Sequence, residues 1–277
     1  MTLPNFLIIG APKAGTTSLY DHMRGHPAIF MPELKEARFL AYQGQGGDRN
    51  RWPVQSLEEY EALFAPVTTE TAIGEATPHY LIYPHAAERI HALLPGARLI
   101  ASLRNPIDRS YSVYQMNLRN QGTNTGVSYG AALAADHNLR ETYAEKLGRY
   151  FALFPRERIR IILLDDLKAK PEAVMRDLFA FLGVDPSYRP DLSKISNPGG
   201  EPRIKLLHDM LAHPGLRAFG RKFLPDGAVE RLKDIRGRNL KKQPMSAADR
   251  NAALDVFRAD ILATQELIGR DLSHWLR

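Results

Sequence analysis

Short apolar runs alternate along the chain with longer stretches of helical periodicity. Apolar runs occupy 6–9, 98–103 and 159–164, and a shorter, less apolar run occupies 73–76. The stretches between them place apolar side chains three and four residues apart, which is typical of helices that bury one face. Helices are expected to begin near 16 and 106 and to cover 57–64, 84–94, 129–154, 171–182 and 246–268. Strands that alternate with helices predict a three-layer α/β domain with a central, mainly parallel sheet and helices on both faces.

The first apolar run leads into a loop bounded by two glycines. The run 6–9 ends at Gly10, and helical spacing starts at Thr16, directly after Gly15. In such a strand, loop and helix, the N–H groups of the loop and of the first helical turn converge on one point and favour an anion. The pattern therefore predicts a phosphate-binding loop. The alternative is a glycine-rich turn that only joins a strand to a helix.

This loop nearly matches the P-loop motif G-x-x-x-x-G-K-[ST], but its cation stands elsewhere. Gly10 and Gly15 have the required spacing, whereas Thr16 occupies the lysine position and the lysine of the loop is Lys13. In a P-loop the lysine reaches the β- and γ-phosphates and the following hydroxyl holds magnesium. A lysine three residues earlier suits a shorter group, so we expect a nucleotide without a γ-phosphate and without a bound metal.

A second anion site is expected where the run 98–103 ends at Arg104. Asn105 is a good N-cap for the helix that follows at once. Arg104 can form a bidentate pair with a phosphate, and Ser112 can add a hydroxyl donor. The alternative is that Arg104 pairs with Asp108 or Asp136 and closes the end of the strand.

Two anion sites on successive parts of one sheet indicate a ligand with phosphates at two separated positions. An adenosine 3′,5′-bisphosphate nucleotide meets this requirement, whereas ATP carries its phosphates on one side. The competing enzyme class is a P-loop kinase or NTPase, which would need magnesium and a triphosphate.

The segment Pro-Lys-Ala-Gly-Thr-Thr-Ser-Leu at 12–19 resembles the 5′-phosphosulfate loop of sulfotransferases that use 3′-phosphoadenosine 5′-phosphosulfate (PAPS). It is most similar to the bacterial and heparan-sulfate-type branch, whose 3′-phosphate arginine and serine fall on Arg104 and Ser112. The resemblance implies a P-loop-like fold and metal-free, in-line transfer of a sulfuryl group, which leaves adenosine 3′,5′-bisphosphate (PAP). The residues that it implies for the 5′ end of the donor are Lys13, Ala14, Gly15, Thr16, Thr17 and Ser18.

The same resemblance suggests a general base. A Lys-Glu-x-x-Phe-type segment places the family's glutamate on Glu36, where it would remove the acceptor proton while Lys13 stabilises the leaving oxygen. Arg38 stands where relatives often have histidine. From the residues alone, the favoured interpretation of Glu36 is a surface carboxylate paired with Lys35 or Arg38. His79, in a segment similar to the family's Glu-x-Thr-Pro-x-Tyr, is the alternative base, or else a capping or surface residue.

Two features lie in the second half of the chain. The loop 197–205 resembles the late loop that covers the adenine and 3′-phosphate in relatives, and it adds Gly200 and Arg203 to the predicted donor site. A plain turn between helices is the alternative. Asp165 and Asp166 imitate a Walker B magnesium site after an apolar strand, but we expect a structural role in which they cap the next helix.

The composition is that of an ordinary globular protein. The chain has 277 residues, 44% hydrophobic and 25% charged, which suits a single domain over 1–277 with a helical C-terminal part, about 201–277, packed on it. It has no cysteine, which excludes disulfides and thiolate metal sites. With no membrane-spanning run and no signal-peptide pattern, we expect a soluble, cytoplasmic protein.

The net charge of +6 is unevenly placed. Residues 217–242 contain nine basic and three acidic residues, so this segment alone carries an excess equal to the total. It could steer an anionic cofactor or acceptor, or bind a polyanion, which is a third functional hypothesis. It could equally be a solvated helical face, and nucleic acid is an unlikely partner because aromatic residues are not interleaved with the charges.

The acceptor is not encoded in any motif of the chain. The polar loops 41–56 and 120–127 are candidates for the acceptor cleft. We expect a carbohydrate or another small molecule, with no prediction of the oligomeric state.

Overall fold

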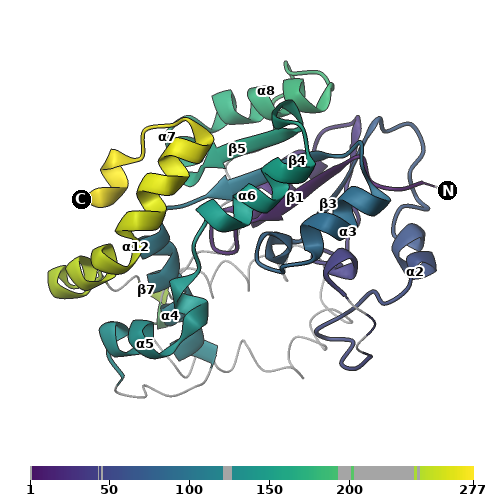
Figure 1. Cartoon of the computed structure of the whole chain (residues 1–277). Helices are drawn as coiled ribbons and strands as arrows, with labels where there is room; N and C mark the ends of the chain where they lie inside the picture. Colours follow the sequence, from purple (N-terminus) through teal and green to yellow (C-terminus); the bar gives the residue numbers. More distant parts are fainter. Residues whose placement is uncertain are drawn as a thin grey trace.

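The computed structural model describes residues 2–42, 44, 46–120, 127–192, 201–202, 240–241 and 244–277. Its centre is a five-stranded parallel sheet in the order β2-β3-β1-β4-β5 (Figure 1). The strands are β1 (Phe6–Gly10), β2 (Ile29–Phe30), β3 (Ala72–Ala76), β4 (Arg98–Leu103) and β5 (Ile159–Leu163). The expected α/β fold with a parallel central sheet is confirmed.

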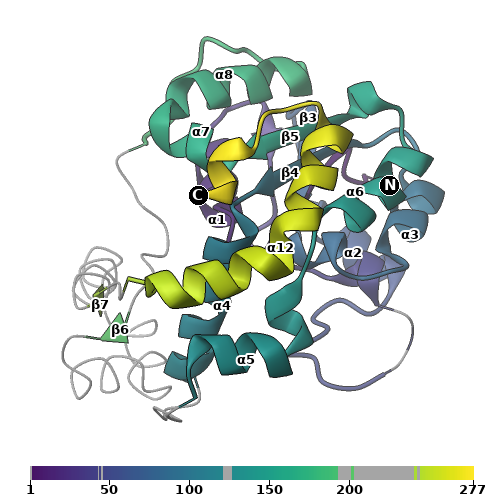
Figure 2. The ribbon, with the colours of Figure 1, turned by 60° about the vertical axis from the view of Figure 1, so that its left-hand side comes forward.

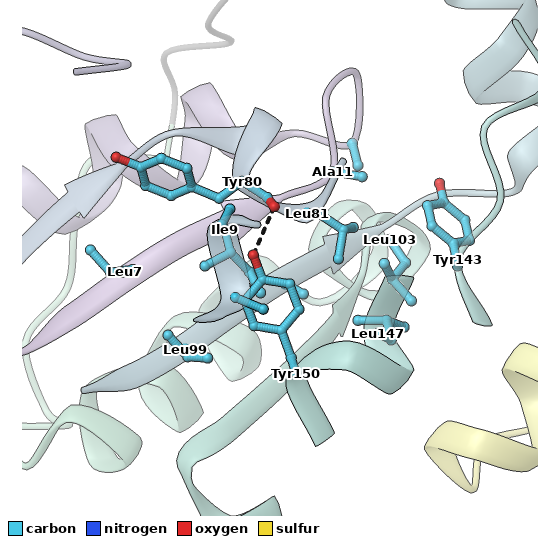
Figure 3. Packing of buried hydrophobic residues seen from close by; sticks show 14 of the residues in the cluster. Leu7, Ile9, Ala11, Tyr80, Leu81, Leu99, Leu103, Tyr143, Leu147 and Tyr150 are labelled. Carbon is cyan, nitrogen blue, oxygen red and sulfur yellow. Dashed lines mark hydrogen bonds between the residues drawn. The ribbon is translucent and has the colours of Figure 1, made fainter. Parts of the chain in front are cut away.

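Side chains of β1 point alternately into two hydrophobic cores. Leu7 and Ile9 pack with α3 and α6, and Figure 3 shows this cluster together with Tyr150 of α6. Phe6 and Ile8 pack on the other face of the sheet with α1 and α8. All four side chains of β1 are fully buried, as expected for a central parallel strand covered on both faces. The covering helices are α1 (Thr16–Arg24), α3 (Ala86–Leu93), α6 (Ala144–Leu153) and α8 (Pro171–Leu182).

The remaining helices surround this three-layer unit. Helix α4 leaves the carboxyl end of β4 and projects beyond the sheet, and α12 crosses it while also packing on α5 and α6 (Figure 2). These helices are α2 (Leu57–Ala62), α4 (Pro106–Asn120), α5 (Tyr129–Ala135), α7 (Leu164–Ala169) and α12 (Ala247–Ile268). Two short antiparallel strands, β6 (Glu201–Pro202) and β7 (Leu240–Lys241), pair with each other.

The C-terminal residues return to the sheet. Helix α12 ends at Gly269, which adopts a left-handed conformation with φ of 65°. Trp275 is almost fully buried, and its Nε1 donates to Asp165 at 2.9 Å. The side-chain amide of Asn105 donates to the carbonyl of Trp275 at 3.2 Å. The C-terminal segment therefore holds the residues that directly follow β4 and β5.

Two expectations about helices were wrong. The helix predicted over 129–154 is divided into α5 and α6, because Asp136 accepts from the amide of Asn138 and starts a short 3₁₀ turn. The acids after β5 do not cap α8, since α7 forms a separate helix before it. Asp166 instead pairs with Arg270 at 2.9 Å.

Several expectations fall outside the described residues. The basic segment 217–242 lies there except for β7, so the division of 1–277 into one domain with a helical part over 201–277 stays a prediction. Across the ranges that are described, no helix combines the length and apolar character needed to cross a membrane.

Candidate active site

The predicted phosphate loop joins β1 to α1. Gly15 has φ of 83° and directly precedes α1, so the first N–H groups of this helix open toward the loop. The loop is tied to β4 because the amide of Ala11 donates to the carbonyl of Ser102 at 2.7 Å. The Ser102 hydroxyl in turn donates to the carbonyl of Ala14 at 2.6 Å. A side chain at position 15 would meet Leu164 at 2.7 Å, which explains the glycine.

Lys13 lies in this loop among cations. Its backbone is left-handed, with φ of 66°, and its amine contacts the sulfur of Met116 in α4 at 3.8 Å. Burial, followed by the positive charges of Arg119 and Arg104, lowers the pKa of Lys13. None of these three cations forms an ion pair with a carboxylate of the described chain. The arrangement therefore favours a bound anion.

The second predicted anion site adjoins the first. A guanidinium nitrogen of Arg104 donates to the carbonyl of Lys13 at 3.3 Å, so the two sites share one place at the carboxyl edge of the sheet. Asn105 caps α4 by accepting from the amide of Ile107 at 2.9 Å, as expected. Ser112 is half-buried two turns along this helix.

The alternative ion pairs of Arg104 are not formed. Asp108 pairs with Arg250, and Asp136 accepts from Asn138. The carbonyl of Arg104 accepts from the Tyr143 hydroxyl at 2.8 Å, which fixes the backbone and leaves the guanidinium group for the loop.

Glu36 lies on the other side of the phosphate loop. Its carboxylate accepts from Arg38 at 2.7 Å and lies 3.8 Å from the Lys35 amine. His79 Nδ1 is 3.5 Å away, at the outer limit of a hydrogen bond. Lys35 also donates to the Thr17 hydroxyl at 2.8 Å and thereby links Glu36 to the start of α1.

These contacts determine the charge of Glu36. Burial opposes its ionisation, but the interactions with His79, Arg38 and Lys35 outweigh burial and lower its pKa to about 2. The carboxylate is therefore ionised at neutral pH. The structure brings together both predicted bases, Glu36 and His79, and it also forms the pairing with Arg38 that was the alternative for Glu36.

The structure adds residues that the sequence reasoning missed. Arg119 follows Met116 by three positions on α4, so helical spacing directs it to the same side as the Lys13 contact. Glu75 is fully buried in β3 beneath the Glu36 segment. The seven-residue spacing from Ser112 could have revealed Arg119. Glu75 is the first residue of the Glu-x-Thr-Pro-x-Tyr segment, which gave it no role. Gly200 and Arg203 lie outside the described residues.

Comparisons with known proteins show similarity to sulfotransferases. A crystal structure of a sulfotransferase from Alicyclobacillus acidocaldarius superposes with a TM-score of 0.74 at 29% identity, covering 100% of both chains. Mouse sulfotransferase SULT7A1 complexed with PAP shares the fold, with a TM-score of 0.54 at 12% identity over 93% of this chain and 84% of that one.

Curated relatives are longer proteins. The membrane-associated sulfotransferase kil1 of Dictyostelium discoideum is 32% identical over 163 residues, which is 57% of this chain and 33% of that protein. The human bifunctional heparan sulfate N-deacetylase/N-sulfotransferase 3 is 26% identical over 293 residues, which is 99% of this chain and 31% of the relative. The chain thus spans about a third of the length of these two relatives. The model of the sulfotransferase family matches residues 4–188, and the chain belongs to that family.

Proposed function

We propose that this chain transfers a sulfuryl group from PAPS to a hydroxyl or amine of a carbohydrate or small-molecule acceptor. The observation that carries the proposal is the contact between the two anion sites. Arg104 donates to the backbone of Lys13 at 3.3 Å, and neither side chain is neutralised by a carboxylate of the described residues. One nucleotide with phosphates at its 3′ and 5′ positions can engage both cations.

The described residues fit such a donor. Lys13, the backbone of Ala14 and Gly15, and the first turn of α1 would hold the 5′ end, with hydroxyl groups from Thr16, Thr17 and Ser18. Arg104 and Ser112 would hold the 3′-phosphate. Gly200 and Arg203 remain part of the proposed site from sequence alone. PAPS supplies the activated sulfuryl group, and the proposed chemistry requires no metal.

On the acceptor side, Glu36 would receive the proton of the attacking hydroxyl. A carboxylate with a pKa of about 2 is a weak base while Arg38 and His79 hold it. We therefore propose that the acceptor displaces at least one of these contacts as it binds, which makes the carboxylate more basic. His79 is the alternative base. Lys13 would stabilise the charge that develops on the leaving phosphate oxygen.

The nature of the acceptor is supported by relatives. Human carbohydrate sulfotransferase 15 is 27% identical over 248 residues, covering 66% of this chain and 44% of that protein. Together with the heparan sulfate enzyme, it favours a carbohydrate acceptor. A cytoplasmic location remains a prediction, since one relative is named as membrane-associated.

Calorimetry would test the donor site. We expect PAP to bind without magnesium and more tightly than Mg-ATP, and Lys13→Ala or Arg104→Ala to weaken PAP binding by about 10- to 100-fold, because each removes a charge-assisted contact. Arg158→Ala is the control, since Arg158 precedes β5 and so lies at the amino end of that strand, away from the carboxyl ends where Lys13 and Arg104 lie. Preference for Mg-ATP would instead indicate a kinase or NTPase.

Mass spectrometry would test the reaction. The protein is incubated with PAPS and a panel that contains heparosan and chondroitin oligosaccharides, simple sugars and phenols. A gain of one sulfuryl group on an acceptor, lost in Lys13→Ala, is the expected result. Absence of any sulfated product together with absence of PAP binding would reject the proposal.

A further inference from the structure

A fully buried carboxyl group lies in β3 near the candidate base. Glu75 has no exposed surface and forms no ion pair with a cation of the described residues. Buried acids are normally paired or bound to a metal, because moving an unpaired charge out of water is costly. The presence of an acid in this central part of the sheet therefore calls for a specific role.

Three hydroxyl groups surround this carboxyl group. The Thr77 hydroxyl donates to one oxygen of Glu75, and the Tyr60 hydroxyl donates to the other at 3.3 Å. Burial raises the pKa of Glu75 to about 7, against the opposing effect of hydrogen bonds from Thr77, Tyr80 and Tyr60. The ring of Tyr60 also stacks on Phe39, with centroids 4.7 Å apart.

Two of these hydroxyls hold the segment that carries the candidate base. The amide of Arg38 donates to the Thr77 hydroxyl at 3.2 Å, and the amide of Leu40 donates to the Tyr80 hydroxyl at 3.3 Å. The amide of Glu36 bonds to the backbone of β3 at 3.0 Å. A hydroxyl that accepts from an amide directs its own proton elsewhere, and here the buried carboxyl group is the acceptor.

The held segment has an uncommon backbone. Glu36 and Arg38 have φ of 65° and 58°, a left-handed conformation that non-glycine residues keep only where their surroundings fix it. Tyr80 is itself fixed, because its carbonyl accepts from the Tyr150 hydroxyl at 2.7 Å (Figure 3). The network thus connects a rigid core to a strained segment.

We propose that Glu75 is a positioning residue that acts through Thr77 and Tyr80 to hold segment 36–40, and with it the carboxylate of Glu36, in place for acceptor activation. The catalytic part of this inference rests on the function proposed above. The positioning part concerns the backbone of the segment and can be tested without any acceptor.

Hydrogen–deuterium exchange would test the positioning directly. At pH 8 the carboxyl group of Glu75 is ionised and only accepts, whereas the side-chain NH₂ of Glu75→Gln faces a hydroxyl that already donates, so one link of the network breaks. Thr77→Val removes another link. We expect the amides of Arg38 and Leu40 to exchange at least about tenfold faster in both variants, with β4 unchanged. Unchanged exchange in the segment, or equal acceleration in β4, would overturn the proposal.

Turnover would test the catalytic consequence. PAP release from PAPS is measured with the acceptor panel, and the rate without acceptor is subtracted. The resulting kcat should fall about 10- to 100-fold in Glu75→Gln and Thr77→Val. PAP affinity should stay within about twofold of the parent protein, because the phosphate loop follows a different strand. A parallel loss of PAP affinity would indicate general damage and overturn the proposal.

Matched variants separate positioning from stability. Thr77→Ser keeps the hydroxyl and should recover most of the kcat lost in Thr77→Val. Thr264→Val is the control, since Thr264 is equally buried in α12 and its hydroxyl has no hydrogen-bond partner among the described residues. If Glu75→Gln does not fold, the comparison of Thr77→Val with Thr77→Ser decides whether the network positions segment 36–40. If the parent protein sulfates no acceptor, the proposed function fails while the exchange experiment still decides the positioning role.

Discussion

Glu36 is ionised because cationic and polar neighbours stabilise its charge, and the same neighbours limit its ability to take a proton. Arg38 contributes the shortest contact, at 2.7 Å, and Lys35 connects the carboxylate to Thr17 in the phosphate loop. The proposed role of Glu36 as general base therefore depends on what the acceptor does to these contacts. A bound hydroxyl that displaces Arg38 would raise the pKa of Glu36 toward that of an ordinary carboxyl group.

Glu36→Gln should lower kcat by about 10²- to 10⁴-fold, because an amide cannot remove the acceptor proton. PAP affinity, measured by calorimetry, should change little. Glu33→Gln is the matched control, since Glu33 is an exposed acid of the same segment. If Glu36→Gln keeps its turnover while His79→Asn loses it, His79 is the base.

Glu75 should make stability depend on pH. Its pKa in the folded protein, about 7, lies above the ordinary glutamate value of 4.5, so folding stabilises the protonated form. The contribution is fully present below about pH 4.5 and is lost as the pH rises through about 7, by on the order of 3 kcal/mol. Urea unfolding at pH 5 and pH 8 should show this loss in the parent protein.

Glu75→Gln provides the comparison, because it cannot ionise. Its difference in unfolding free energy between pH 5 and pH 8 should be smaller than that of the parent. Glu36 does not interfere in this window, since its lowered pKa keeps it ionised throughout. Equal pH dependence in both proteins would show that Glu75 does not titrate there.

Single residues were predictable only where a local pattern exposed them. Lys13 and Arg104 follow apolar runs, so their position at strand ends could be read from the sequence. The approach of His79 to Glu36 could not, because it depends on how two distant strands pair. The left-handed backbone at Glu36 and Arg38 could not be predicted from the local sequence, since neither residue is a glycine.

At the scale of elements, the phosphate loop depends on one glycine. Gly15→Ala should weaken PAP binding and lower stability, because an alanine is strained at φ of 83° and its methyl group would meet Leu164 at 2.7 Å. Calorimetry and thermal unfolding measure the two effects. Gly148→Ala is the control, since Gly148 lies in α6 with open space around it and should gain up to about 1 kcal/mol.

Elements with strong apolar runs were predicted well. A division between two helices was missed where the sequence shows no clear interruption. The run 98–103 matches β4, and Asn105 caps α4 as expected. The division between α5 and α6 was missed because apolar spacing continues across it. There the side chain of Asp136 competes with the helix for a backbone amide.

At the scale of the whole molecule, the C-terminal segment fastens the carboxyl ends of β4 and β5. Trp275 contacts the residues that follow both strands, and its ring lies against Tyr143, which holds the carbonyl of Arg104. A distant part of the chain therefore supports one of the two anion-binding cations. No pattern in the sequence predicts these contacts of the C-terminal segment.

Trp275→Ala should destabilise the protein by about 3–5 kcal/mol, as expected for a buried tryptophan. Where the variant remains folded, it should also weaken PAP binding, because Tyr143, which donates to the carbonyl of Arg104, loses the ring beside it. Urea unfolding and calorimetry measure these effects. Leu262→Ala is the control, since this side chain of α12 is 46% exposed. Unchanged PAP affinity in a folded Trp275→Ala would show that the C-terminal segment does not support the proposed donor site.

The central place of β1 in the sheet has a consequence for how related proteins can diverge in sequence. Segments after β1 and β4 carry the cations of the proposed donor site, whereas those after β2 and β3 carry Glu36 and His79. Apart from Lys35, which donates to Thr17, residues on the β2 and β3 side can thus change without removing a contact of the proposed donor site. Related proteins with this fold can therefore change their acceptor while they keep the same sulfuryl donor.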